Sequence, residues 1–143
     1  MTLDALRPVA DRVLEPPARV AARAGVTSDA VSVIAFALAI AAACAYGLAG
    51  GATGWLAALG FDATRSGLVG NRWFYLVGSL LVLANGWFDL LDGALAREHG
   101  TASDSGDLLD HVLDRYADVA IVGGLAAGLG AYALGFLAVT GVL

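Results

Sequence analysis

The chain has 143 residues, of which 59% are hydrophobic, and its mean hydropathy of +0.75 exceeds that of ordinary soluble domains. The formal net charge is −5 and all eight basic residues are arginines, with no basic patch, so the sequence predicts no nucleic-acid partner. Together these values exclude an ordinary soluble domain and predict one all-α integral membrane domain over residues 1–143.

The N-terminal segment, residues 1–28, places apolar residues near helical spacing and charged residues on the opposite side. This pattern is typical of an amphipathic helix that lies at a membrane interface. We expect Pro16 and Pro17 to break the helix, because proline removes a backbone donor and clashes with the preceding turn. A second short helix then covers residues 18–24, and Gly25 is expected to cap its end.

Two long apolar stretches predict transmembrane helices. Residues 30–49 are almost wholly apolar, with Ser32 as the exception, and have about the length needed to span a bilayer. Thr27 or Ser28 is expected to cap the start of this first helix. Residues 73–98 begin as a second span and continue into a run of acidic residues.

The C-terminal part of the sequence predicts a third span and the start of a fourth. Residues 107–129 begin with acidic residues and then become apolar, which suits a third transmembrane helix. Residues 131–143 are apolar but too short to span a bilayer alone. The expected fold is therefore an interfacial N-terminal helix followed by at least three transmembrane helices and part of a fourth.

Acidic residues are concentrated between the second and third predicted spans. Eight of the thirteen fall in residues 87–118, and they are Asp89, Asp92, Glu98, Asp104, Asp107, Asp110, Asp114 and Asp118. Carboxylates beside apolar membrane helices are costly and usually face a cavity, a partner or an ion. The cluster is therefore the strongest candidate for a functional site; the alternative is a set of solvated acids at the membrane surface.

The spacing of four of these acids favours a metal site. Asp89 and Asp92 are three residues apart, and Asp110 and Asp114 are four apart, so each pair shares one face of a helix. Two helices joined by a tight turn would bring the pairs face to face, where the carboxylates repel one another unless a cation lies between them. Such hard oxygen ligands suit Mg²⁺, Mn²⁺ or Ca²⁺ rather than zinc. The residues alone thus indicate metal-dependent phosphate chemistry at a membrane surface.

The same segment resembles the signature of the CDP-alcohol phosphotransferase family, also called the CDP-alcohol phosphatidyltransferases. The resemblance fixes eight positions over 26 residues, and they are Asp89, Asp92, Gly93, Ala96, Arg97, Gly106, Asp110 and Asp114. It implies transfer of a phosphatidyl-type group from a CDP-linked lipid to a small alcohol acceptor, with release of CMP, in phospholipid biosynthesis. It also implies Mg²⁺ or Mn²⁺ as the cofactor.

The resemblance assigns an expected role to each signature position. The metal ligands would be Asp89, Asp92, Asp110 and Asp114, and Asp114 would also act as the general base. The CDP moiety would be bound by Gly93, Ala96, Arg97 and Gly106. Taken singly, the two glycines would also fit helix packing and the arginine would fit an interfacial side chain.

The chain departs from this family in one respect, because members usually have six transmembrane helices. An alternative interpretation is a truncated or inactive relative, a non-catalytic membrane protein that binds divalent cations or CDP-lipid. The acceptor stays open among inositol phosphate, glycerol phosphate, serine and choline-like alcohols, and the donor between diacyl and ether lipids. The family is often homodimeric, and the small-residue helix faces permit a homodimer.

The arginines predict the orientation in the cell membrane. Six of them lie on the side of the N-terminus and the acidic cluster, namely Arg7, Arg12, Arg19, Arg23, Arg97 and Arg115. The other two, Arg65 and Arg72, lie on the opposite side. By the positive-inside rule, the N-terminus and the active site are expected to face the cytoplasm.

Overall fold

A computed structural model describes residues 7–50, 70–99 and 104–142 of the chain, and side chains within 13–50, 70–95 and 111–141. In these residues all regular secondary structure is helical. The helices are α1 (Arg7–Arg23), α2 (Ser28–Gly50), α4 (Trp73–His99), α5 (Asp104–Leu129) and α6 (Tyr132–Val142).

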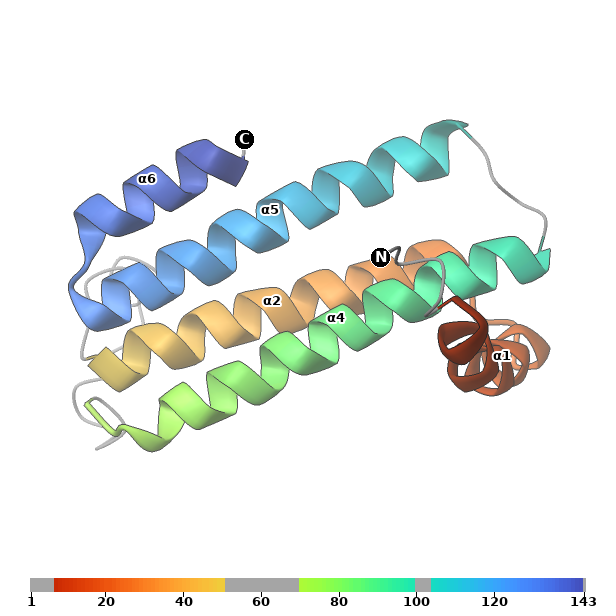
Figure 1. The fold of residues 1–143 in the computed structure, drawn as a ribbon, viewed down its shortest axis with the longest axis horizontal. Coiled ribbons are helices and arrows are strands. Elements are labelled where there is room, and N and C mark those ends of the chain that lie inside the picture. The colour runs from red at the N-terminus through yellow and green to blue at the C-terminus, as the bar shows by residue number, and fades with distance from the viewer. Residues whose placement is uncertain (1–6, 51–69, 100–103, 143) are drawn as a thin grey trace.

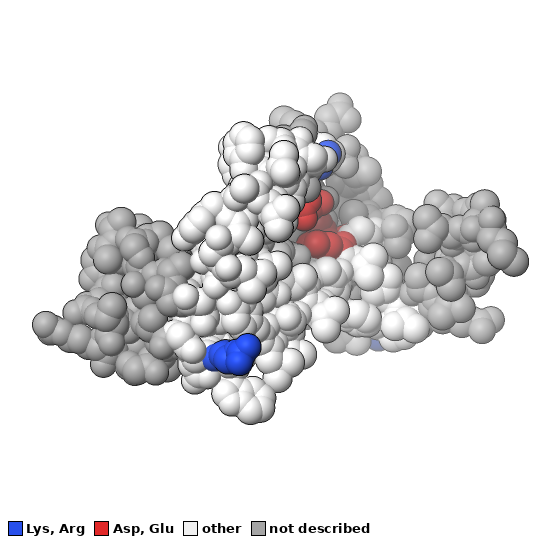
Figure 2. All heavy atoms as spheres, turned by 60° about the vertical axis from the view of Figure 1, so that its left-hand side comes forward, with Lys and Arg blue, Asp and Glu red and all other residues white. Residues whose placement is uncertain are grey.

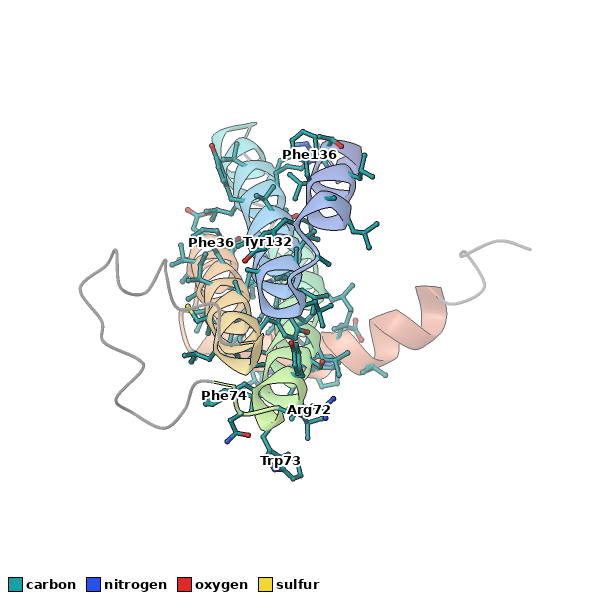
Figure 3. All side chains as sticks on the ribbon, turned by 90° about the vertical axis from the view of Figure 1, so that its left-hand side faces the viewer. Phe36, Arg72, Trp73, Phe74, Tyr132 and Phe136 are labelled. Carbon is teal, nitrogen blue, oxygen red and sulfur yellow. The ribbon has the colours of Figure 1, made fainter. Side chains whose placement is uncertain are left out.

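The helix α2 is the centre of the bundle. It packs against both α4 and α5, running antiparallel to α4 and parallel to α5, and α6 turns back along α5 (Figure 1). The helix α1 packs against α4 and crosses one end of the bundle, at a steep angle to the other helices in two views (Figures 1 and 3). This arrangement brings the start of α2, the end of α4 and the start of α5 to the same end of the molecule.

The helix α1 continues through Pro16 and Pro17, so the predicted break at these residues is wrong. Two features hold the helix together across the prolines. On one side, Leu14 and Ala18 are buried, and Ala18 packs in a cluster with residues of α2 and α4. On the exposed side, an ion pair of 3.0 Å joins Arg19 to Glu15, one turn earlier. Tertiary burial therefore outweighs the two backbone hydrogen bonds that the prolines cannot make.

The turn from α1 to α2 follows the predicted capping. Gly25 has a φ of +75°, and the Val26 amide donates to the Ala21 carbonyl at 3.0 Å, as in a Schellman cap. At the start of α2, the Ala30 amide donates to the Thr27 hydroxyl at 3.3 Å. Thr27 is therefore the N-cap of α2, which leaves the Ser28 side chain for another partner.

Small residues allow α2 and α5 to pack closely. The buried face of α2 is largely alanine, with Ala35, Ala39 and Ala42 almost fully buried. Opposite this face, a Cβ atom added at Gly124 would meet the backbone of Ala43, and one added at Gly128 would meet the Tyr46 carbonyl. Close backbone approach through small residues is a common way for membrane helices to associate.

Three hydrogen bonds of polar side chains join the helices away from the acidic end. The Asn85 amide of α4 donates to the Ala35 carbonyl of α2 at 3.0 Å, and both residues are buried. The Tyr75 hydroxyl of α4 donates to the Gly128 carbonyl of α5 at 2.8 Å. The Tyr46 hydroxyl lies 3.3 Å from that of Ser79. These bonds satisfy polar groups that would otherwise be costly among apolar helices.

Two of the described helices, α2 and α4, are long and apolar enough to cross a membrane. They match the predicted spans 30–49 and 73–98, and α5 and α6 occupy the positions predicted for the third and fourth helices. Membrane crossing by α2, α4 and α5 and an interfacial position for α1 stay predictions. Large apolar side chains are exposed along α4 and α6, and these include Leu76, Leu80, Leu83, Leu134, Phe136 and Leu137. Figure 3 shows Trp73 pointing away from the bundle at the start of α4.

Candidate active site

Acidic groups gather at the end of the bundle where α1 crosses it. The described members are Asp29, Asp89, Asp92, Asp114 and Asp118. Figure 2 shows acidic atoms grouped in one recess, while the rest of the visible described surface is nearly uncharged. Arg72 lies at the opposite end, where α4 begins (Figure 3). The bundle is thus polar at one end and apolar along most of its length.

Asp92 is the most buried of these acids, with 5% of its surface exposed. Both of its carboxylate oxygens accept hydrogen bonds from α2. The Ser32 hydroxyl donates to Oδ2 at 2.7 Å, and the Ser28 hydroxyl donates to Oδ1. Hydrogen bonds to a charged acceptor are stronger than those between neutral groups, so two of them offset part of the cost of burying the carboxylate.

Asp89 and Gly93 flank Asp92 on α4, and both are exposed. Asp89 comes nearly one helical turn before Asp92, so the two carboxylates lie on neighbouring positions of one face. The last part of α4 contains Ala96 and Arg97, and their side chains lie outside the described residues. Five signature positions are therefore carried by one helix, as the sequence predicted.

Asp114 is exposed on α5. Its carboxylate interacts electrostatically with Asp118, His111, Asp92 and Arg115. The interaction with Asp92 is between helices. The preceding turns of α5 contain Gly106 and Asp110, whose side chains are not among those described. Asp92 and Asp114 thus interact electrostatically from two helices, and the face-to-face meeting of the two acidic pairs stays a prediction.

The chemistry of these residues fits a hard divalent cation. Asp92 and Asp114 come from different helices and interact electrostatically, and a cation bound by both would offset the repulsion between their carboxylates. Among the described side chains, however, no three metal-ligating groups converge. In this arrangement Asp92 is turned toward the serines of α2. A ligand set of Asp89, Asp92, Asp110 and Asp114 therefore stays a prediction.

Sequence reasoning missed the part that α2 plays in the site. Ser28 was interpreted only as a cap, and Ser32 only as an exception in an apolar run. The available signal was their spacing, because two serines four residues apart at the start of an apolar helix share one face. Asn85, the buried amide of α4, was also missed, although an amide inside an apolar run needs a partner.

Comparison with known proteins identifies the relatives of the chain. The family model described as CDP-alcohol phosphatidyltransferase matches residues 53–143. An archaetidylinositol phosphate synthase from Methanothermobacter thermautotrophicus is 31% identical over 88% of the chain and 51% of its own length. A second one, from Pyrococcus horikoshii, is 43% identical over 51% of the chain and 39% of its own length. A phosphatidylinositol phosphate synthase from Mycobacterium marinum is 34% identical over 80% of the chain and 39% of its own length.

The chain spans about half or less of the length of these relatives. No solved structure matches it with significance. The segment matched by the family model contains all eight signature positions, from Asp89 to Asp114. The helices α1 and α2 precede this segment, so Ser28 and Ser32 lie outside it.

Proposed function

The chain belongs to the CDP-alcohol phosphatidyltransferase family, and from this premise we propose that it transfers a phosphatidyl-type group from a CDP-linked lipid to an alcohol acceptor. The observation that carries the proposal is the electrostatic interaction of Asp92 on α4 with Asp114 on α5, at the end of the bundle that holds every signature position. Cation binding alone would not require the glycines and the arginine that accompany the acids. Their presence supports recognition of a nucleotide-linked donor.

The acceptor that we propose is an inositol phosphate. Relatives from three organisms are named as synthases of archaetidylinositol phosphate or phosphatidylinositol phosphate, and this is the common element of their names. The names differ in the lipid part, so they do not select between ether and diacyl donors. The proposal selects inositol phosphate from the acceptors that the sequence left open, which also include glycerol phosphate, serine and choline-like alcohols.

We assign the chemical steps to residues of this chain as follows. Asp114 takes the proton from the acceptor hydroxyl, whose oxygen forms a bond to the lipid-linked phosphorus of the donor. The bond from that phosphorus to the bridging oxygen breaks, and CMP leaves with the electron pair. Arg97 holds the phosphates through its planar cationic fork, and Gly93 allows the nucleotide to approach the backbone of α4.

A divalent cation, Mg²⁺ or Mn²⁺, would be held by Asp89, Asp92, Asp110 and Asp114. When bound, it supplies positive charge that stabilises the departing phosphate. The protein would contribute these ligands from two helices, α4 and α5, so that they are brought together before the donor arrives. Asp114 would then serve both as a ligand and as the base, as the family resemblance implies.

We further propose that α2 and α4 cross the cell membrane with the acidic end on the cytoplasmic side. The charged end and the long apolar exposed face of α4 support this placement. The helix α1 lies at a steep angle to α2 and α4, and this suits a helix that lies along the membrane surface. A site at this depth can receive a lipid donor from the bilayer and a water-soluble acceptor from the cytoplasm.

The test is CMP release by the purified chain in detergent, with a CDP-linked lipid and Mn²⁺. The acceptors to compare are inositol phosphate, glycerol phosphate, serine and choline. We expect release that requires both Mn²⁺ and inositol phosphate. Release with another acceptor alone would overturn the acceptor assignment, and absence of release with every acceptor would overturn the proposed transfer by this chain.

A further inference from the structure

We infer that Ser28 and Ser32 are positioning residues that hold the Asp92 carboxylate in the orientation required for a divalent cation. The inference rests on the proposed function, because it assumes that Asp92 is a metal ligand. It adds a contribution from α2, which lies outside the segment matched by the family model. Neither serine is assigned to contact the substrate.

The geometry fixes the carboxylate from one side. Ser28 and Ser32 are one helical turn apart on α2, and each donates to a different oxygen of Asp92. Two hydrogen bonds from one rigid helix prevent the carboxylate from rotating freely about its last side-chain bond. Asp92 itself is buried, so water does not replace these partners. The orientation of Asp92 is therefore set by α2 rather than by α4 alone.

The hydrogen bonds leave lone pairs of the Asp92 carboxylate unused. An ionised carboxylate has about four lone-pair positions on its two oxygens, and the serines use one on each oxygen. One position on each oxygen stays available for a metal ion. Because a hydroxyl has one proton, the 2.7 Å bond of Ser32 to Asp92 competes with its longer 3.3 Å contact to the Ser28 carbonyl. The shorter bond has a charged acceptor and is the stronger of the two.

Groups that donate hydrogen bonds to a metal ligand usually have a strong effect on the affinity for the metal. Hydrogen-bonded groups behind a ligating side chain orient it, and their loss typically weakens metal binding about 10- to 100-fold. The loss of one serine hydroxyl would leave one oxygen of a buried carboxylate without its donor and would free the group to rotate. A purely structural role for the serines would lower the stability of the bundle but would leave metal affinity unchanged.

The experiment measures Mn²⁺ binding to the full chain in detergent by electron paramagnetic resonance of the free ion. The variants are Ser32→Ala, Ser28→Ala and Ser32→Thr, which keeps a hydroxyl. The matched control is Ser79→Ala, since Ser79 is a helical serine near the apolar end and its hydroxyl donates to the Tyr75 carbonyl at 2.8 Å. We expect Mn²⁺ affinity to fall about 10-fold or more in each variant that loses a hydroxyl at position 28 or 32. Ser32→Thr and the control are expected to bind like the unaltered chain.

A kinetic measurement tests whether Ser32 acts by positioning the Asp92 carboxylate. CMP release by Ser32→Ala is expected to need more Mn²⁺ for half-maximal rate and to reach nearly the original rate at saturation. Should Ser32→Ala fail to fold, Ser28→Ala carries the same test at a less buried position. Unchanged Mn²⁺ affinity in the folded alanine variants would overturn the inference while leaving the proposed function intact. Absence of Mn²⁺ binding by the unaltered chain would overturn both the inference and the proposed metal dependence.

Discussion

The carboxylate of Asp92 on α4 lies within electrostatic range of the carboxylate of Asp114 on α5. Two helices that are joined by a short connection thus present like charges to each other at one end of the bundle. A cation bound by both carboxylates would offset the repulsion between them. This relationship links the stability of the bundle to its proposed chemistry.

Divalent cations are expected to stabilise the folded chain. A cation that binds only the folded state adds about 2.7 kcal/mol of stability when its concentration is 100 times its Kd. Thermal unfolding in detergent, followed by circular dichroism, should therefore show a higher Tm with Mn²⁺ than with a chelator. The increase should disappear in Asp92→Asn, which loses a charged ligand.

The control for this experiment is Asp118→Asn. Asp118 is also acidic and interacts with Asp114, but the sequence interpretation places it outside the ligand set. The variant should keep the Mn²⁺-dependent increase in Tm. If Asp118→Asn and Asp92→Asn lost the Mn²⁺-dependent increase in Tm equally, the increase would reflect unspecific attraction of cations to an acidic surface.

Asp114→Asn should separate catalysis from donor binding. An amide cannot take the proton from the acceptor hydroxyl, so we expect kcat to fall about 100-fold or more. The KM for the CDP-linked lipid should change much less, because the donor is held by other residues. A variant that loses donor binding to the same extent as turnover would show that Asp114 mainly holds the metal or the donor.

Gly128→Ala should destabilise the contact between α2 and α5. The added methyl group would meet the Tyr46 carbonyl, and overpacking of this kind costs about 1–3 kcal/mol. Gly123→Ala is the matched control, because a Cβ atom there has no neighbour within 4 Å. We expect a lower Tm for the first variant and an unchanged or higher Tm for the second. Equal effects would contradict the close approach of the two helices.

The orientation in the membrane can be tested with single cysteines. Cys44 is the only cysteine of the chain, so Cys44→Ala provides a background without thiols. In that background, Arg72→Cys should react with an impermeant maleimide added to intact cells. Arg23→Cys should react only after the cells are opened. The reverse labelling pattern would place the acidic end outside the cytoplasm.

The positions of the helices could be predicted from the sequence because apolar length and capping residues are local signals. Thr27 and Gly25 cap their helices as such residues usually do, and α2, α4, α5 and α6 begin and end within a few residues of the predicted ranges. The continuity of α1 could not be predicted, because it depends on burial of Leu14 and Ala18. Local proline chemistry alone favours a break.

For the site, the spacing of the aspartates predicted that α4 and α5 carry carboxylates toward the same end of the bundle, and Asp92 and Asp114 interact electrostatically there. The hydrogen bonds from Ser28 and Ser32 to Asp92 could not be predicted from spacing. They join residues about 60 positions apart and depend on the antiparallel packing of α2 against α4. Long-range partners of this kind are fixed by tertiary structure and leave only a weak pattern in the sequence.

The most direct test of the central claim follows the acceptor into the lipid. The chain is incubated in detergent with a CDP-linked lipid, Mn²⁺ and isotopically labelled inositol phosphate, and the extracted lipids are analysed by mass spectrometry. The account predicts a labelled phospholipid from the unaltered chain, and none when Asp114→Asn replaces it or when a chelator is added. Label confined to the aqueous phase in every sample would contradict the proposed transfer.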